Sequence, residues 1–360
     1  MTMMSNLPSD LVEEILSRLP LKSMRSLRLT CKNWNALLKS RSFTKLHTDK
    51  EEAARKEGES QKIVMMDNDV YLMSIVVNDM NVDSSIELKG KLTCLDEQVT
   101  ISQVFHCEGL LLCILRNDSR LVVLNPYLGQ TKWIETYPFN KRESYKYAFG
   151  YVSVKNNSCR SLKILRFTDG SWYQIYDFDS GLWRDLDVTP HWGEISAYNL
   201  GVSLNGNTYW GVIQRESCQT IYFDFTRERF GSLLYTQRFT FRYLVFQSLS
   251  CVKEEKLAAL FWCNLSDVTE YEVWITTKID ADEKVSWSKF LTVDNRTDIP
   301  ITILDGGFFI DEEKKVAVVF GSFYPHTCII LGEAGYFREV KLGEPANDRR
   351  LKHVCSMFQV

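Results

Sequence analysis

Apolar residues in the first part of the chain recur at helical spacing. Leu11, Ile15 and Leu19 stand at i, i+4 and i+8, on one face of a helix that Pro20 ends. The same spacing then continues through two further short helices. The pattern therefore predicts an all-α trihelical unit over residues 1–46. A unit of this size hides little of its surface when it folds alone, so we expect it to bind a partner.

Charged side chains dominate the next stretch, residues 47–61. Glu51 and Glu52 lie about one helical turn before Arg55 and Lys56, as on a solvated helix. We expect a charged tether that carries no chemistry and sets the distance between the domains on either side of it.

Short apolar runs fill the remainder of the chain, residues 62–360. They are rich in Val, Ile, Leu, Phe, Tyr and Trp and are bounded by clusters of Gly, Asn, Asp and Ser, which is typical of β-strands. Equivalent polar ends recur at Asn125, Asp177 and Asp224, a spacing of about fifty residues, which suits the four-stranded blade of a kelch-like propeller. Five such units follow Ile101, and earlier runs with a C-terminal strand form one more. The prediction is an all-β kelch-like propeller of about six blades.

The composition is that of a soluble globular protein. Of 360 residues, 45% are apolar and 25% are charged. The N-terminus lacks the pattern of a secretory signal, and no run approaches the roughly 18 apolar residues of a membrane span. Ten cysteines are scattered without a Cys-x-x-Cys pair, which favours reduced thiols over disulfides or zinc. We expect an intracellular protein of the nucleus, the cytoplasm or both, with no membrane contact and no bound metal.

The charge is unevenly distributed, although the net value is only −3. Residues 1–46 hold 8 Lys and Arg against 3 Asp and Glu, so this part is basic and the rest is acidic. Lys32, Asn33 and Asn35 on a short helix suggest a helix-turn-helix and a nucleic acid as partner. Trp34 leaves little of that helix free, however, and an acidic protein partner explains the charge equally well. We therefore expect no nucleic acid as partner.

The run from Leu7 to Phe43 resembles an F-box. Two stretches match the pattern, L-P-x-D-L-x-x-E-I-L-x-x-L-P and then R-x-T-C-K-x-W-N. The matching residues are Leu7, Pro8, Asp10, Leu11, Glu14, Ile15, Leu16, Leu19, Pro20, Arg28, Thr30, Cys31, Lys32, Trp34 and Asn35. The resemblance implies docking onto a Skp-type adaptor and, through it, onto the cullin and RING subunits of a ubiquitin ligase. By analogy the adaptor-binding residues are Leu7, Pro8, Leu11, Ile15, Leu19, Pro20 and Trp34, of which Trp34 fits the helical core equally well.

The body resembles the plant F-box-associated interaction domain. The sequence segments that carry this resemblance are Phe105–Leu111 and Leu124–Pro126. Only Gly306-Gly307 supplies the double glycine that kelch repeats carry in every blade. Together the two resemblances cover essentially the whole chain. They imply a non-catalytic substrate-recognition subunit of a Skp–cullin–F-box ubiquitin ligase, in which the propeller captures a protein substrate.

We find no catalytic constellation in the sequence. The histidines after the tether have neither a His nor a Cys pair at ligand spacing, and His106 beside Cys107 is better explained as a buried, hydrogen-bonded side chain. The run Gly201–Gly206 resembles G-x-S-x-G but fits a strand that ends in an Asn-Gly turn. We expect no catalytic residue and no cofactor. Two alternatives stay open, a scaffold that binds the adaptor without ubiquitin transfer and a glycan-binding or hydrolytic propeller.

Blade geometry predicts where a substrate binds. In a blade with strands a, b, c and d counted outward from the axis, the b–c and d–a connections emerge on one face and the a–b and c–d connections on the other. The c–d connections consist of turn residues, as at Asn125–Gly129, whereas those of the first kind carry aromatic side chains. These aromatics either cap the packing between blades or bind the substrate. The predicted substrate-binding residues are Tyr137, Phe139, Trp172, His191, Trp192, Phe323 and Tyr324.

Overall fold

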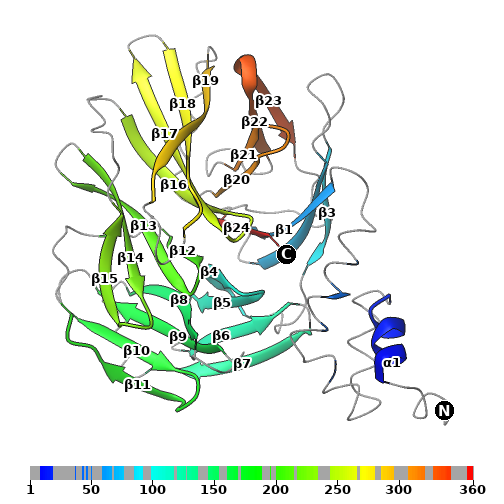
Figure 1. Cartoon of the computed structure of the whole chain (residues 1–360), viewed down its shortest axis with the longest axis vertical. Coiled ribbons are helices and arrows are strands. Elements are labelled where there is room, and N and C mark those ends of the chain that lie inside the picture. Colours follow the sequence, from blue (N-terminus) through cyan, green and yellow to red (C-terminus); the bar gives the residue numbers. More distant parts are fainter. Residues whose placement is uncertain are drawn as a thin grey trace.

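The protein is described here from a computed structural model. The structure describes residues 9–18, 37, 43, 46–47, 50, 59–66, 69–76, 85–91, 99–116, 120–126, 128–136, 145–153, 160–168, 172–188, 195, 200–214, 217–233, 244–265, 268–279, 285–295, 307–320, 327–341 and 355–359. These residues form helix α1 (Ser9–Leu16) and six antiparallel sheets of four strands each (Figure 1). The fold is a six-bladed all-β propeller with a short helical segment before it.

Each sheet is one blade, and the blades are numbered here by their innermost strands. Blade 1 consists of β4 (Ile101–Cys107), β5 (Leu110–Leu115), β6 (Arg120–Asn125) and β7 (Gln130–Glu135). Blade 2 consists of β8 (Lys146–Ser153), β9 (Arg160–Phe167), β10 (Tyr173–Asp177) and β11 (Leu182–Asp185). Blade 3 consists of β12 (Val202–Leu204), β13 (Asn207–Gln214), β14 (Ser217–Asp224) and β15 (Arg229–Leu233). Blade 4 consists of β16 (Leu244–Val252), β17 (Lys256–Leu265), β18 (Val268–Thr276) and β19 (Trp287–Asn295). Blade 5 consists of β20 (Phe308–Asp311), β21 (Val316–Phe320), β22 (Thr327–Gly332) and β23 (Tyr336–Lys341), with the 3-10 turn η2 (Glu333–Gly335) before β23.

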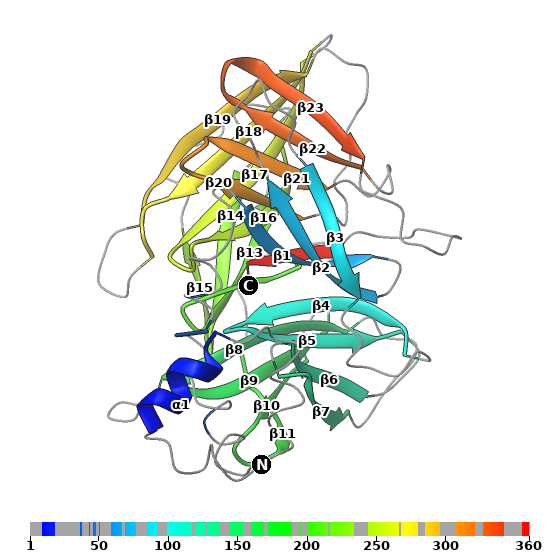
Figure 2. The same ribbon diagram turned by 90° about the vertical axis from the view of Figure 1, so that its right-hand side faces the viewer.

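Blade 6 joins the two ends of the propeller. Its strand order is β24 (Cys355–Gln359), β1 (Glu59–Met66), β2 (Asp69–Val76) and β3 (Ser85–Lys91), so the last strand of the chain is innermost and pairs with the first. The innermost strands β4, β8, β12, β16, β20 and β24 each contact the next, and β24 contacts β4 (Figures 1 and 2). The ring is therefore closed. The prediction of six blades, one of them closed by a C-terminal strand, is confirmed.

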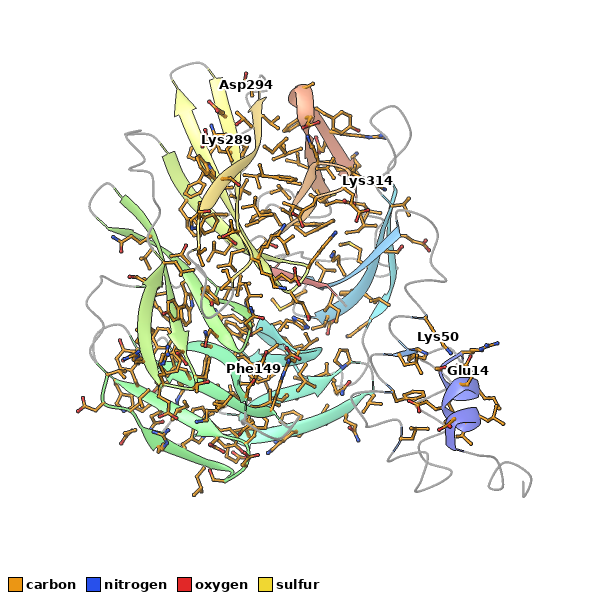
Figure 3. All side chains as sticks on the ribbon, viewed as in Figure 1. Glu14, Lys50, Phe149, Lys289, Asp294 and Lys314 are labelled. Carbon is orange, nitrogen blue, oxygen red and sulfur yellow. The ribbon has the colours of Figure 1, made fainter. Side chains whose placement is uncertain are left out.

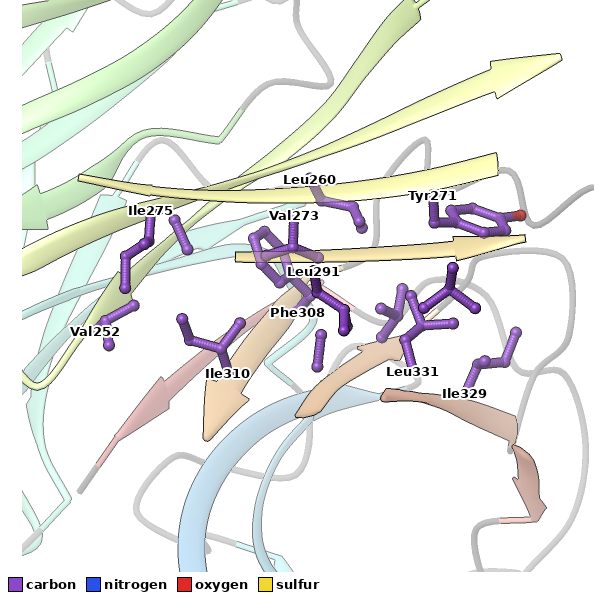
Figure 4. Close-up of a cluster of buried hydrophobic side chains, with 14 residues drawn as sticks. Val252, Leu260, Tyr271, Val273, Ile275, Leu291, Phe308, Ile310, Ile329 and Leu331 are labelled. Atoms are coloured by element: carbon purple, nitrogen blue, oxygen red, sulfur yellow. The ribbon is translucent and has the colours of Figure 1, made fainter. Parts of the chain in front are cut away.

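The core of the propeller is divided among the gaps between blades. Each of six clusters of buried apolar side chains combines residues of two neighbouring blades. Figure 4 shows the cluster between blades 4 and 5, where Leu260 and Val273 of one blade face Phe308 and Leu331 of the other. Burial of such surfaces between blades is the main source of stability in this architecture.

Middle strands are buried on both faces, which explains their unbroken apolar runs. In β21 all five residues are buried, and alternate side chains enter different clusters: Val316 and Val318 face blade 6, while Ala317 and Val319 face blade 4. Such a strand shows no alternation of apolar and polar residues, because neither of its faces meets water.

The short turns predicted from Asn, Asp and Gly are confirmed. Asp177 Oδ1 accepts hydrogen bonds from the backbone N–H groups of Asp179 and Ser180, and Asp224 Oδ1 accepts the equivalent pair in blade 3. Gly206 follows Asn205 with a positive φ of 82°, as the Asn-Gly turn requires.

The first predicted helix is present as α1, which ends at Leu16, earlier than the predicted end at Pro20. Most residues of the two further predicted helices and of the charged tether lie outside the described residues, so the trihelical arrangement stays a prediction. In the part of the chain that the structure describes, no helix is long and apolar enough to cross a membrane.

Candidate functional site

Helix α1 presents two large apolar side chains to solvent. Leu11 is 50% exposed and Ile15 is 39% exposed, although they follow each other on successive turns of one face. Leu16, by contrast, is buried. This pair on an amphipathic helix is a candidate surface for contact with another chain.

The helix also makes ionic contacts beside the exposed pair, because Glu14 and Arg18 follow Leu11 at i+3 and i+7. Lys50 donates hydrogen bonds to Glu14 Oε2 and, at 2.9 Å, to Ser17 Oγ, and Arg18 Nη2 lies 2.6 Å from Glu14 Oε1 (Figure 3). The bonds from Lys50 and then Arg18 lower the pKa of Glu14 below its ordinary value. The carboxylate is therefore charged at neutral pH. The polar contacts of α1 thus involve Glu14 and leave Leu11 and Ile15 uncovered.

The other predicted adaptor-binding residues are not placed. Leu7, Pro8, Leu19, Pro20 and Trp34 lie outside the described residues. Their role at an adaptor interface stays a prediction.

Of the predicted substrate-binding residues, the structure describes Trp172. It precedes β10 in the connection from β9, which is a b–c connection. The strand order also makes residues 186–201 a d–a connection and residues 321–326 a b–c connection, as the face assignment requires. The remaining predicted residues, Tyr137, Phe139, His191, Trp192, Phe323 and Tyr324, lie outside the described residues.

Trp172 belongs to a cluster around the guanidinium group of Arg166. The centre of this group lies 5.0 Å from the ring centroids of Tyr145 and Trp172 and 4.8 Å from that of Trp183. The rings of Tyr145 and Trp172 are themselves 5.8 Å apart. Guanidinium and aromatic faces attract each other at such distances. We call these four residues the Arg166 cluster.

A polar row crosses all four strands of blade 2 beneath the rings. Strand register pairs Tyr147 with Arg166, Arg166 with Gln174, and Gln174 with Asp185. Arg166 Nη2 donates to Gln174 Oε1 at 2.6 Å, and Gln174 Nε2 donates to Asp185 Oδ1 at 2.8 Å. The amide of Gln174 therefore stands between the cation and the exposed carboxylate.

Burial shapes the electrostatics of the Arg166 cluster. The Arg166 side chain is fully buried, and this desolvation lowers its pKa, although an arginine stays charged at neutral pH. Burial raises the pKa of Tyr147 to about 12, and the charge of Arg166 opposes that rise. The result is a buried positive charge with aromatic and neutral polar neighbours.

Sequence reasoning missed Arg166. Its strand, Arg160–Phe167, shows an arginine near the end of an apolar run, which looks like an ordinary strand terminus. A signal for the site was present in the sequence: the aromatic residues Tyr145, Trp172 and Trp183 each stand two positions before a residue of the polar row. It becomes readable only when the register of the four strands is known.

His106, predicted as a buried, hydrogen-bonded side chain, is hydrogen-bonded and half-buried. His106 Nε2 accepts a hydrogen bond from the backbone N–H of Gly109 at 3.0 Å, and burial lowers the pKa of the imidazole to about 4. It is therefore neutral at physiological pH. Among the described residues, no group of three His, Cys, Asp or Glu side chains is arranged to hold a metal ion.

Comparison with known proteins places the chain in a family. A model of the F-box associated beta propeller domain matches residues 61–360, and a model of the F-box domain matches residues 4–46. The F-box/kelch-repeat protein At4g33290 of Arabidopsis thaliana is 50% identical over 98% of this chain and 88% of its own length. The F-box protein At2g38590 of the same plant is 48% identical over 99% of this chain and 89% of its own length. The chain belongs to the F-box proteins that carry an F-box associated β-propeller, and the resemblance inferred from the sequence is confirmed.

One relative carries a different name. Peroxiredoxin-2A of Arabidopsis thaliana is 50% identical over 98% of this chain and 67% of its own length. Thiol chemistry needs an accessible thiolate, whereas burial raises the pKa of Cys107 and of Cys251 to about 12. Burial also raises the pKa of Cys328. These three thiols are therefore protonated at neutral pH.

Proposed function

We propose that this chain is the substrate-recognition subunit of a Skp–cullin–F-box ubiquitin ligase. The observation that carries the proposal is the exposed pair Leu11 and Ile15 on α1, at the front of an F-box and ahead of a closed propeller. Two large apolar side chains on one helix face supply the buried centre that a protein interface needs.

The proposed division of labour follows the two domains. The F-box, a trihelical unit in this proposal, docks the Skp-type adaptor and through it the cullin and RING subunits, with Leu7, Pro8, Leu19, Pro20 and Trp34 beside Leu11 and Ile15. The kelch-like propeller captures a protein substrate on its b–c and d–a face. These events take place in the nucleus, the cytoplasm or both.

The proposed mechanism is proximity. Holding a substrate beside a charged conjugating enzyme raises the effective concentration of its lysines, so the receptor itself performs no covalent chemistry. The protonated thiols and the neutral, hydrogen-bonded His106 fit this non-catalytic role.

Adaptor capture tests the proposal. Leu11→Asp and Ile15→Asp each place a carboxylate in an interface that excludes water, which costs several kcal/mol, so we expect either change to remove adaptor binding in a pull-down with the purified Skp-type adaptor.

A matched control exists on the propeller. Leu182 on β11 is 66% exposed, so Leu182→Asp makes the same chemical change far along the chain and should leave adaptor capture intact. Circular dichroism checks that all variants keep the propeller. Retention of the adaptor by folded Leu11→Asp and Ile15→Asp variants would contradict the proposal.

A further inference from the structure

Three cations of strand β9 have different surroundings. Arg160 forms an ion pair with Glu108, and Lys163 Nζ lies 2.7 Å from Glu228 Oε1 and 3.8 Å from Asp177 Oδ2. Arg166 is the most buried of the three, yet no described carboxylate lies within ion-pair distance of it. Buried charges in proteins are usually paired, because a charge without a counter-ion is costly to desolvate.

The donors of Arg166 are also incompletely used. An arginine has five N–H donors on three nitrogens. Nη2 bonds to Gln174, while Nε and Nη1 are buried and have no hydrogen-bond partner within the described part of the chain. The rings of Trp172 and Trp183 supply no acceptor, and the hydroxyl of Tyr147, which interacts with Arg166 by charge and hydrogen bond, leaves Nε and Nη1 unsatisfied. A group with strong acceptor atoms would satisfy them.

The Arg166 cluster lies at the end of blade 2 where substrate capture is proposed. Arg166 is the residue before the last of β9, Asp185 ends β11, and Trp172 stands in the b–c connection. Tyr145 comes just before β8, so it follows the d–a connection from blade 1. Both kinds of connection on this face therefore reach the same guanidinium group.

The rings hold the guanidinium group in a fixed place. Trp183 Nε1 donates to the backbone oxygen of Glu135 in blade 1 at 2.8 Å, which ties its ring to the neighbouring blade. Trp172 stands outside the strands, and the backbone N–H of Thr168 donates to its carbonyl oxygen at 3.2 Å. Trp172 and Tyr145 are half-buried, whereas Arg166 beneath them is buried. Because Arg166 is fully buried, a ligand reaches the cation only if a covering side chain such as Trp172 is displaced.

We propose that Arg166 binds a carboxylate of the protein substrate and that Tyr145, Trp172 and Trp183 hold the guanidinium group for it. The planar carboxylate matches the planar guanidinium, whose free N–H groups give it two or more charge-assisted hydrogen bonds. The inference rests on the proposed function, because it takes the propeller to be the part that captures a substrate. The carboxylate comes from an Asp or Glu side chain or from a chain terminus.

Peptide selection tests the site and separates the two sources. The full chain, bound to its adaptor, is used to select from random short peptides made once with a free C-terminal carboxylate and once with a C-terminal amide. An acidic side chain as the source predicts Asp or Glu at one fixed position in peptides from both libraries. A chain terminus predicts binders from the free-carboxylate library alone. In either case, changing that carboxylate to its amide should weaken binding about tenfold or more.

The variant Arg166→Met tests whether this residue is responsible. Methionine keeps much of the apolar stem and removes the charge, so the selected peptides should lose about tenfold or more in affinity, as they do when their carboxylate becomes an amide. Arg160→Met is the control, since it removes a cation from the other end of the same strand and should leave affinity unchanged. If Arg166→Met does not fold, the comparison of acid and amide peptides on the wild-type chain still decides.

Three results would overturn the inference. They are equal binding of the acid and amide forms, full affinity of the folded Arg166→Met variant, and selection of phosphorylated peptides alone when these are offered. If Arg166 does not bind a carboxylate, adaptor capture through Leu11 and Ile15 is unaffected. If the proposed function is wrong, adaptor capture does not depend on Leu11 and Ile15.

Discussion

The two ends of blade 2 are built differently. On the side of the a–b and c–d connections, Glu228 in the c–d turn of blade 3 bonds to Lys163 and Arg184 of blade 2. At the other end, Arg166 is surrounded by aromatic rings and has no carboxylate partner among the described residues. At one end the charged side chains therefore pair with those of the neighbouring blade. At the other end the positive charge of Arg166 has no carboxylate partner among the described residues. Proteins usually accept such a local cost where they bind something.

Close backbone packing adds to cohesion at the first end. The backbone N–H of Tyr151 donates to Gly206 O at 3.1 Å, and Thr208 Oγ1 donates to Phe149 O at 3.1 Å (Figure 3 labels Phe149). Both bonds join blade 2 to blade 3. Gly150 lies between these two bonds. No larger residue fits there, because a Cβ atom would meet Gly206 O at 2.3 Å and the ring of Phe225 at 2.4 Å.

The largest expected effect comes from Gly150→Ala. The added methyl group cannot fit unless the two blades separate, so we expect a loss of at least about 2 kcal/mol in the free energy of unfolding, measured by urea denaturation. Gly109→Ala is the comparison, since a methyl group added there would meet no atom within 4 Å and only the φ of 71° is unfavourable. Equal losses in the two variants would show that contact between blades 2 and 3 does not matter here.

A smaller effect is expected from Glu228→Gln. The change keeps the shape of the side chain and removes the charge that Lys163 and Arg184 share, so unfolding should become easier by about 1 kcal/mol. Glu313→Gln is the control, because Glu313 is 83% exposed in its ion pair with Lys253 and should contribute little. An equal effect of the two changes would contradict the account of this end.

Arg166→Met should alter stability less than Glu228→Gln. Relief of the desolvated charge offsets the loss of contacts with the rings, so we expect a change within about 1 kcal/mol. The measurement is again denaturation of the purified chain. A destabilisation of several kcal/mol would assign Arg166 a structural role and would remove the contrast between the two ends.

The smallest effect concerns pH. Burial alone would raise the pKa of Glu228, but hydrogen bonds from Arg184 and Lys163 outweigh it and hold the pKa below its ordinary value of 4.5. Because the folded pKa is the lower one, this group stabilises the fold above pH 4.5, and the contribution disappears as pH falls through the folded pKa. The stability difference between wild type and Glu228→Gln should therefore shrink in acid. A difference that persists or grows there would contradict the pairing.

The sequence was sufficient to predict the six-bladed propeller. Turn residues such as Asp177 and Asp224 act locally, so their spacing revealed the blades before any contact was known. The apolar face of α1 and the closing role of the C-terminal strand were also predicted.

The Arg166 cluster depended on information that the sequence does not display. Arg166, Gln174 and Asp185 meet only because strands β9, β10 and β11 pair in one register, and a shift of one residue would turn each side chain to the other face. Trp172 was predicted as a binding residue from its place in a loop, without its cationic neighbour. Long-range pairing, not local pattern, makes this site.

Ubiquitin transfer in a reconstituted ligase tests the central claim most directly. Proteins that co-purify with the chain in an adaptor-dependent manner are offered to a complex of the chain, a Skp-type adaptor, a cullin, a RING subunit and a charged conjugating enzyme. We expect at least one bound protein to be ubiquitinated with the wild-type chain and with Leu182→Asp, and none with Leu11→Asp. An assembled complex that binds these proteins and transfers no ubiquitin to them would contradict the account and would identify the chain as a scaffold.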